Sequence, residues 1–243
     1  MRALILAAGY ATRLYPLTEH QPKPLLKVGD KLIIEHILSK IEEIKGIEEV
    51  YIVTNDKFYP SFAALKNNLK TPLRIEIIND GTKSNEDRLG AIGDIHFVIE
   101  QKMIKDDLLV IAGDNLFGFA LPELVHFFQQ KNSSVVAFHD LKNLEKVKGK
   151  YGVGILEGSR IIDFEEKPSE PKSALASTAC YLFKKQDLSC IGTLAKTKKA
   201  DAPGNLIKYL AKNSEVHGFV FHQHWFDIGS FESLEEAKKE YEK

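Results

Sequence analysis

The sequence contains only two cysteines, Cys180 and Cys190, among 243 residues. They lack the C-x-x-C spacing of zinc and redox motifs, and two cysteines cannot form the disulfide framework of a small secreted domain, so we expect both to be reduced. No apolar run approaches the roughly 18 residues of a membrane-spanning helix. The start Met1-Arg2-Ala3 leads directly into an apolar stretch without the regions of a signal peptide, and we expect a cytoplasmic protein.

An excess of basic charge is also missing. The chain has 33 Lys and Arg against 34 Asp and Glu, for a formal net charge of −1. Nucleic-acid-binding surfaces are usually basic, so this balance argues against such a partner. No internal repeat, low-complexity tract or linker divides the chain, and a single domain over residues 1–243 is the simplest prediction.

Short apolar runs alternate with segments of helical periodicity in the first half of the chain. Strands are predicted over residues 50–54, 73–78, 108–112 and 134–139, and helices over residues 33–44, 61–69, 89–101 and 122–131. Near-continuous apolar strands are typical of a parallel sheet that helices cover on both faces. The pattern therefore predicts a three-layer α/β fold with ligands beyond the carboxyl ends of the strands.

The pattern changes after residue 139. Two strand-like runs, 151–156 and 161–165, flank a short turn with Gly158 and predict a hairpin that adds a small layer to a mixed, mostly parallel central sheet. Further predicted elements are a strand over 173–183, a helix over 205–212, a strand over 216–222 and a helix over 231–241, with a mobile loop over 196–204.

The most informative stretch begins at Leu4 and reads LILAAGYATRLYPLT, followed by QPKPLL from Gln21. A short apolar run that enters a small-residue turn, then Arg13 and ten residues later Lys23, is typical of a strand that presents backbone amides and two cations to a phosphate chain. Neither the P-loop motif nor the dinucleotide motif G-x-G-x-x-G is present here. On Gly9 alone, a buried first strand with an ordinary glycine turn remains the alternative.

In order and spacing, this stretch closely resembles the signature of the sugar-1-phosphate nucleotidyltransferases, L-A-x-G-x-x-T-R-L-x-P-L-T followed by P-K-P-L. The resemblance implies a Rossmann-like nucleotidyltransferase fold and transfer of a nucleoside monophosphate from an NTP to a sugar 1-phosphate, as in glucose-1-phosphate thymidylyltransferases and uridylyltransferases. It also implies that Arg13 and Lys23 are catalytic, on the triphosphate and near the α-phosphate. The implied nucleotide-binding residues in this stretch are Leu6, Ala7, Ala8, Gly9, Thr12 and Arg13.

Two aspartates are candidate Mg²⁺ ligands. Asp114 directly follows a buried strand, where an Asp is either a metal ligand or a turn residue. The segments around Asp114 and Asp227 resemble the family's G-D-N and W-x-D-x-G-T elements, whose aspartates hold the metal together. The alternative for Asp227 is the cap of the last helix, a role that Ser230 fits better.

The acceptor site is implied by the segment Glu165-Glu166-Lys167-Pro168, which resembles the family's E-K-P element. Lys167 would contact the phosphate and Glu166 the sugar hydroxyls. Without the resemblance, a solvated loop is the simpler interpretation. Weaker matches to the family's sugar pocket are Tyr151, Gly152, Ser177 and Thr178.

The base-reading loop corresponds to residues 79–91, and Asn79, Leu89 and Gly90 are the implied nucleotide contacts. The family's glutamine is absent there, which leaves the base open. Residues 202–207 also depart from the acidic stretch of thymidylyl enzymes. His222 and His224 are expected at a strand end rather than at a metal.

The sequence thus predicts an enzyme that uses Mg²⁺, an NTP, with dTTP or UTP favoured, and a hexose 1-phosphate. The partners are these substrates, without nucleic acid or membrane, and a homo-oligomer is possible. A cytidylyltransferase acting on phosphocholine and a non-catalytic regulatory homologue remain alternatives.

Overall fold

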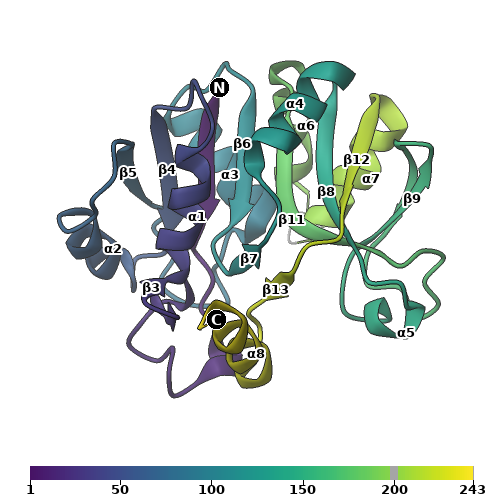
Figure 1. The fold of residues 1–243 in the computed structure, drawn as a ribbon. Coiled ribbons are helices and arrows are strands. Elements are labelled where there is room, and N and C mark those ends of the chain that lie inside the picture. Colours follow the sequence, from purple (N-terminus) through teal and green to yellow (C-terminus); the bar gives the residue numbers. More distant parts are fainter. Residues whose placement is uncertain (198–201, 243) are drawn as a thin grey trace.

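The computed structural model describes residues 1–197 and 202–242, and its main feature is a nine-stranded sheet. In chain order the strands are β1 (Arg2–Leu6), β4 (Glu49–Thr54), β5 (Arg74–Asn79), β6 (Leu108–Ala112), β8 (Ser134–Asp140), β9 (Val153–Glu157), β10 (Arg160–Glu165), β11 (Leu175–Phe183) and β12 (Val216–Phe221). Their spatial order is β5-β4-β1-β6-β11-β8-β12-β10-β9 (Figure 1). The helices are α1 (Ile33–Glu42), α2 (Tyr59–Lys66), α3 (Gly90–Gln101), α4 (Leu121–Lys131), α5 (Leu144–Val147), α6 (Leu188–Ala195), α7 (Pro203–Asn213) and α8 (Phe231–Tyr241).

The sheet is mixed, as predicted. Strands β5, β4, β1 and β6 are parallel, and β12 is parallel to β8. Strand β11 runs antiparallel to both β6 and β8, and β10 is antiparallel to β9 and β12. Parallel pairing therefore predominates only in the first half, where each strand is followed by a helix that returns the chain to the same edge.

Helices cover both faces of the sheet and give the three predicted layers (Figure 1). The alternation of side chains along β1 shows the arrangement, since Ala3 and Ile5 join one buried cluster and Leu4 joins the other. The first cluster includes residues of α1, α4 and α8, and the second includes residues of α3, α6 and α7.

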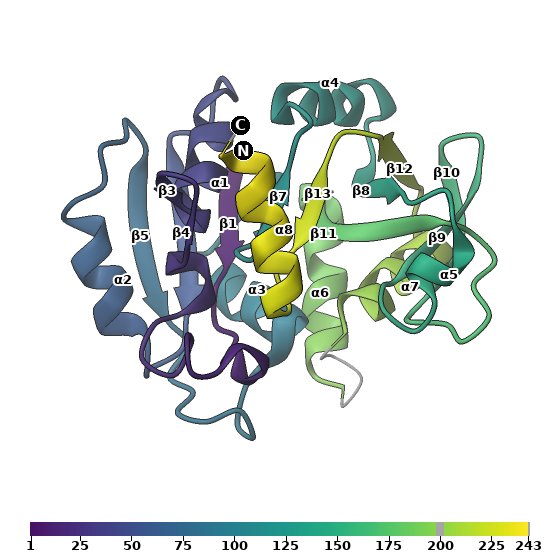
Figure 2. The same ribbon diagram turned by 60° about the horizontal axis from the view of Figure 1, so that its bottom comes forward.

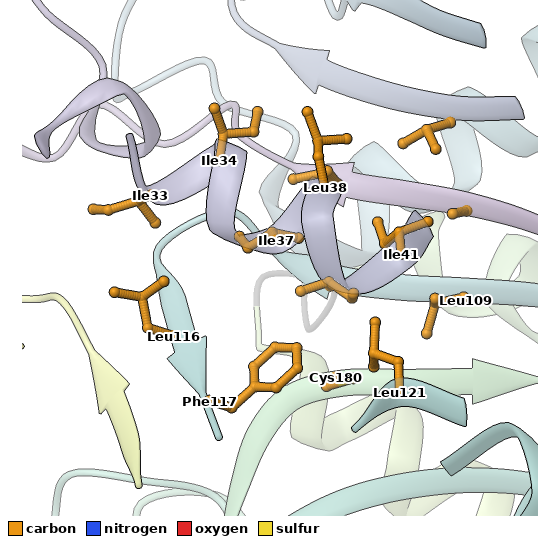
Figure 3. Packing of buried hydrophobic residues seen from close by; sticks show 14 of the residues in the cluster. Ile33, Ile34, Ile37, Leu38, Ile41, Leu109, Leu116, Phe117, Leu121 and Cys180 are labelled. Atoms are coloured by element: carbon orange, nitrogen blue, oxygen red, sulfur yellow. The ribbon is translucent and has the colours of Figure 1, made fainter. Parts of the chain in front are cut away.

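Helix α1 shows how the sequence pattern makes a layer. Its isoleucines and leucine recur at helical spacing and are buried, and Figure 3 shows them against side chains of the sheet and of α4. Because the Glu35 carboxylate accepts a 2.7 Å hydrogen bond from the Leu32 backbone N–H, the first turn also satisfies a free donor. The buried residues of the helix are Ile33, Ile34, Ile37, Leu38 and Ile41.

The structure refines several predicted elements. The hairpin β9–β10 forms as predicted, but it is hydrogen-bonded to the main sheet through β12, and β9 also pairs with β11 at Val153 and Ala176. Helix α6 falls in a region where no helix was predicted, and α7 begins at Pro203, inside the predicted mobile loop. Residues 198–201 of that loop lie outside the described residues.

Two short ribbons complete the fold and lie outside the main sheet. They pair β2 (Lys27–Val28) with β3 (Lys31–Leu32), and β7 (Asn115–Phe117) with β13 (Trp225–Asp227). Over residues 1–197 and 202–242, every helix is too short or too polar to cross a lipid bilayer.

Candidate active site

The carboxyl ends of β1 and β6 form the edge at which the candidate residues gather. The two strands pair in register from Arg2 with Leu108 to Leu6 with Ala112, and the Gly113 N–H donates a 2.8 Å hydrogen bond to the Leu6 carbonyl. The turn after β1 and the segment after β6 therefore start side by side. Figure 2 brings this edge forward, together with α8.

The ribbon β7–β13 brings the two predicted aspartates together. Asn115 pairs with Asp227, and the Ile228 N–H donates a 3.0 Å hydrogen bond to the Asp114 carbonyl. The indole N–H of Trp225 donates a 2.6 Å hydrogen bond to Asn115 Oδ1, which fixes the ribbon from its other strand. Although Asp114 and Asp227 are far apart in sequence, the fold places them at one edge, as the resemblance implied.

Lys23 reaches the same point. Its ammonium donates a 2.7 Å hydrogen bond to Asp114 Oδ2, and Asn115 Nδ2 donates one of 2.9 Å to Oδ1. Burial raises the pKa of Asp114, but the Lys23 cation and these hydrogen bonds outweigh it and leave that pKa lowered. Burial and then the Asp114 charge raise the pKa of Asp227 to about 6, although Lys23 and Arg13 oppose this. The site therefore holds two close carboxylates of which only one is paired with a lysine.

A cavity of about 430 Å³ lies over the turn after β1. Of the predicted nucleotide contacts, Gly9, Thr12 and Arg13 line it together with Lys23. Leu6 and Ala7 line a small adjoining cavity that also reaches Lys23 and Asp114. The predicted contact Ala8 is buried beside these cavities, where its carbonyl accepts a 2.9 Å hydrogen bond from Asn55 Nδ2.

The loop after β5 enters this cavity through residues that the sequence did not single out. Asn85 and Arg88 line the cavity, whereas the predicted contacts Asn79, Leu89 and Gly90 do not. Asn79 is engaged elsewhere, since its Nδ2 donates to Asp56 after β4 and its Oδ1 accepts from the Gly81 N–H. The Asp87 carboxylate accepts from the backbone N–H groups of Lys83 and Ser84, which shapes the turn that carries Asn85 and Arg88.

A second cavity, of about 270 Å³, adjoins the aspartates and contains the predicted acceptor residues. Arg13, Asp114 and Asp227 belong to its wall, and Arg13 also lines the first cavity, so the two cavities lie on either side of this side chain. The predicted residues that line it are Tyr151, Gly152, Glu166, Lys167, Ser177 and Thr178. Thr178 is fully buried and its hydroxyl donates a 2.9 Å hydrogen bond to the Ala137 carbonyl, which indicates a structural contribution.

Glu166 is half-buried in the wall of this second cavity. Burial raises the pKa of its carboxyl, while Lys167 and the Gly204 N–H near the start of α7 lower it in part. A Cβ added to Gly204 would collide with Glu166 Oε2, and one added to Gly152 would lie 2.5 Å from the Phe164 ring. Both glycines are therefore required by close approach rather than by a turn.

Three residues of the site other than glycine adopt left-handed backbone conformations. They are Ala11 at φ 50°, Lys167 at φ 45° and Ala179 at φ 52°. Ala179 lies in β11 where the register with β8 shifts between Ser177 and Tyr181. Such conformations cost energy for residues with a Cβ and cluster at functional sites, and no sequence signal announced them.

Over the described residues, no group of three or more His, Cys, Asp or Glu side chains is arranged to hold a metal. The donor set at Asp114 and Asp227 nevertheless fits Mg²⁺, which accepts one or two carboxylates and completes its octahedron with water and substrate phosphates. His222 and His224 lie in the short connection between the end of β12 and the start of β13.

Comparison with known proteins identifies relatives along the whole chain. The family model described as "Nucleotidyl transferase" matches residues 2–243. The bifunctional protein GlmU of Methanocaldococcus jannaschii is 30% identical over 241 residues, which is 98% of this chain and 54% of that protein. The GlmU of Methanococcus aeolicus is 29% identical over 94% of this chain and 51% of its own length. The chain thus spans about half the length of these curated relatives.

Solved structures agree in fold. A putative glucose-1-phosphate thymidylyltransferase from Bacillus anthracis, in complex with a sucrose, superposes with a TM-score of 0.86 at 26% identity, over 100% of this chain and 95% of that one. An apo UDP-glucose pyrophosphorylase superposes with a TM-score of 0.82 at 23% identity, over 99% of this chain and 97% of that one, and shows the fold alone.

Proposed function

Because the chain belongs to the nucleotidyl transferase family, we propose that it transfers a nucleoside monophosphate from an NTP to a sugar 1-phosphate and releases pyrophosphate. The observation that carries the proposal is the convergence of Lys23, Asp114 and Asp227 where the two cavities meet. A hexose 1-phosphate with dTTP or UTP is favoured. The Bacillus anthracis relative, described as a thymidylyltransferase of glucose 1-phosphate, supports this choice.

In the proposed reaction, an oxygen of the sugar 1-phosphate attacks the α-phosphorus of the NTP in line, and the bond to pyrophosphate breaks. The attacking oxygen is already a phosphate anion, so neither a general base nor a covalent enzyme intermediate is needed. Arg13 binds the triphosphate, and Lys23 stabilises the negative charge that develops at the α-phosphate. Lys167, which lines the second cavity together with both aspartates, holds the phosphate of the acceptor.

Asp114 and Asp227 are the residues that would hold Mg²⁺. When bound there, the ion neutralises phosphate charge and orients the reacting groups. Lys23 competes for Asp114, because its ammonium already occupies Oδ2. We therefore expect weak metal binding without nucleotide and tighter binding once phosphates supply further oxygen ligands.

A substrate matrix tests the proposal. The four NTPs are crossed with several sugar 1-phosphates and with phosphocholine, and pyrophosphate release is measured with Mg²⁺ and with excess chelator. We expect turnover with a pyrimidine NTP and a hexose 1-phosphate only when Mg²⁺ is free. Turnover with CTP and phosphocholine alone would replace the sugar by another phosphate acceptor, and nucleotide binding without any turnover would indicate a regulatory homologue.

A further inference from the structure

We call the cavity over the turn after β1 the nucleotide cavity, and the second cavity, which contains the predicted acceptor residues, the acceptor cavity. A third cavity, of about 660 Å³, opens beside the acceptor cavity, and we call it the vestibule. Arg13, Tyr151 and Lys167 line both cavities, so a bound acceptor can extend from one into the other. The vestibule is bounded by the segment from α5 to Tyr151 and by the first turns of α8. The acceptor cavity is the expected place of the sugar ring and its phosphate. The vestibule adds space beside it for a further group of the acceptor.

Four cationic side chains line the vestibule: Arg13, Lys146, Lys150 and Lys167. Lys146 lines the vestibule but neither the nucleotide nor the acceptor cavity. Over the described residues, the nearby ion pairs join Lys148 to Glu145 and Lys172 to Glu165, and they leave out all four cations.

The carboxylates of the vestibule come from other elements. Glu232 and Glu236 belong to α8, and Asp227 belongs to the proposed metal site. Within residues 1–197 and 202–242, no ion pair joins Glu232 or Glu236 to Lys146 or Lys150. The lysines therefore retain charge that a bound anion can neutralise.

The backbone holds the lysines beside the acceptor element. The Gly149 N–H donates a 2.9 Å hydrogen bond to the Pro168 carbonyl, which ties the segment that carries Lys146 and Lys150 to the segment of Lys167. Gly149 has φ +65° and Lys167 has φ 45°, so both segments bend sharply at this link. At the other end, the Asn143 side chain caps α5 by accepting a 2.9 Å hydrogen bond from the Glu145 N–H.

We propose that the vestibule binds a second anionic group of the acceptor, a phosphate or a carboxylate, while Lys167 contacts the phosphate that attacks. The inference rests on the proposed function of the adjoining acceptor cavity. Leaving pyrophosphate is a poorer occupant, because its expected place is the turn from Gly9 to Arg13 and Lys146 does not reach that cavity.

Binding is measured by titration calorimetry on the full chain with glucose 1-phosphate, glucose 1,6-bisphosphate and glucuronic acid 1-phosphate. We expect at least one of the two acceptors that carry a second anionic group to bind about tenfold more tightly than glucose 1-phosphate, the scale of one charge-assisted contact. The preferred ligand distinguishes a phosphate from a carboxylate. Lys146→Gln should reduce the preference by about threefold or more, whereas Lys148→Gln, on the same segment but outside the vestibule, should retain it.

Equal affinity for all three acceptors would overturn the inference, and so would a preference that Lys146→Gln leaves unchanged. A variant that instead loses affinity for pyrophosphate would assign the vestibule to the leaving group and also overturn it. Turnover of the same compounds with the four NTPs is measured in parallel. Turnover without the binding preference contradicts the vestibule alone, whereas the binding preference without turnover contradicts the proposed function alone.

Discussion

Lys23 Nζ lies 2.7 Å from Asp114 Oδ2 across ninety-one residues of sequence. The contact joins the segment after β1 to the segment after β6 at the edge where the cavities meet. It neutralises one carboxylate of the proposed metal site, while Asp227 keeps a pKa raised to about 6 by burial and by Asp114. Lys23 and the two aspartates therefore form one electrostatic unit.

Lys23→Ala removes the cation nearest the expected α-phosphate. We predict that kcat falls by about 10²- to 10³-fold, the usual scale for loss of one preorganised electrostatic donor. The secondary structure should be unchanged, because the ammonium lies at a cavity wall. Steady-state kinetics and circular dichroism check this, with Lys27→Ala in β2 as the control. Activity within about threefold of the parent would remove Lys23 from the reaction.

Lys167→Ala tests the acceptor side. The residue lines the acceptor cavity and the vestibule but not the nucleotide cavity. We therefore predict that the KM for the sugar 1-phosphate rises by about tenfold or more while the KM for the NTP changes little. Lys172→Ala is the matched control, since Lys172 pairs with Glu165 outside these cavities. Equal changes in both KM values would indicate a structural effect of the left-handed backbone at residue 167.

Gly204→Ala should disturb the acceptor site from within a helix. Alanine is the better helix former, but its Cβ would collide with Glu166 Oε2 and with the Phe164 ring. We predict a raised KM for the sugar 1-phosphate and an unchanged KM for the NTP. Ala211→Gly, later in α7, is the control for an effect on helix stability alone. It should lower the melting temperature without changing the KM for the sugar 1-phosphate relative to the KM for the NTP. An unchanged acceptor KM in Gly204→Ala would show that Glu166 does not orient the sugar.

The sequence was most informative where a strand fixes the position of the residue that follows it. Asp114 and the turn at Gly9 follow apolar strands that pair in register, so their meeting at one edge was predictable. The cap of α8 was predictable too, because serine is a preferred residue at the start of a helix. In the structure, the Ser230 hydroxyl accepts a hydrogen bond from the Ser233 N–H.

Other features depend on tertiary contacts that a local pattern does not encode. Helix α6 is rich in Ser, Cys, Gly and Thr, and it forms because Leu188 and Ile191 are buried in the cluster that includes α3. Gly192 faces the His96 ring at a distance that leaves little room for a Cβ. Likewise, Asn85 and Arg88 face the nucleotide cavity because hydrogen bonds to Asp87 shape their loop. From the sequence, Asn79, Leu89 and Gly90 of the same loop were predicted as the nucleotide contacts instead.

Asp227→Asn should stabilise the metal-free protein at alkaline pH. A carboxyl whose pKa rises from 3.8 to about 6 on folding contributes stability below about pH 4, and this contribution is lost as the pH rises through 6. Asparagine resembles the protonated form, so the variant avoids the loss. We predict a melting temperature about 2–5 °C above the parent at pH 8 in chelator, with the difference vanishing near pH 4. Glu157→Gln, at the end of β9, is the control and should not show this pH-dependent difference. A difference in melting temperature between Asp227→Asn and the parent that does not change with pH would contradict the raised pKa of Asp227.

The shared-metal assignment makes its own prediction for a double-mutant cycle. Asp114→Asn and Asp227→Asn each remove one proposed Mg²⁺ ligand, and each should lower kcat/KM strongly at saturating Mg²⁺. If both residues act through one ion, the second substitution finds that ion already displaced. The double variant should therefore lose little more activity than the worse single variant.

The same cycle includes a measurement independent of turnover. Mg²⁺ affinity is titrated with and without bound NTP, and in the parent we expect much tighter binding with NTP, because the triphosphate supplies ligands that two carboxylates cannot. Each single variant should lose this coupling between metal and nucleotide. Losses of kcat/KM that add in the double variant, together with coupling that survives in either single variant, would mean that Asp114 and Asp227 act independently. Asp114 would then serve mainly to position Lys23, its 2.7 Å partner.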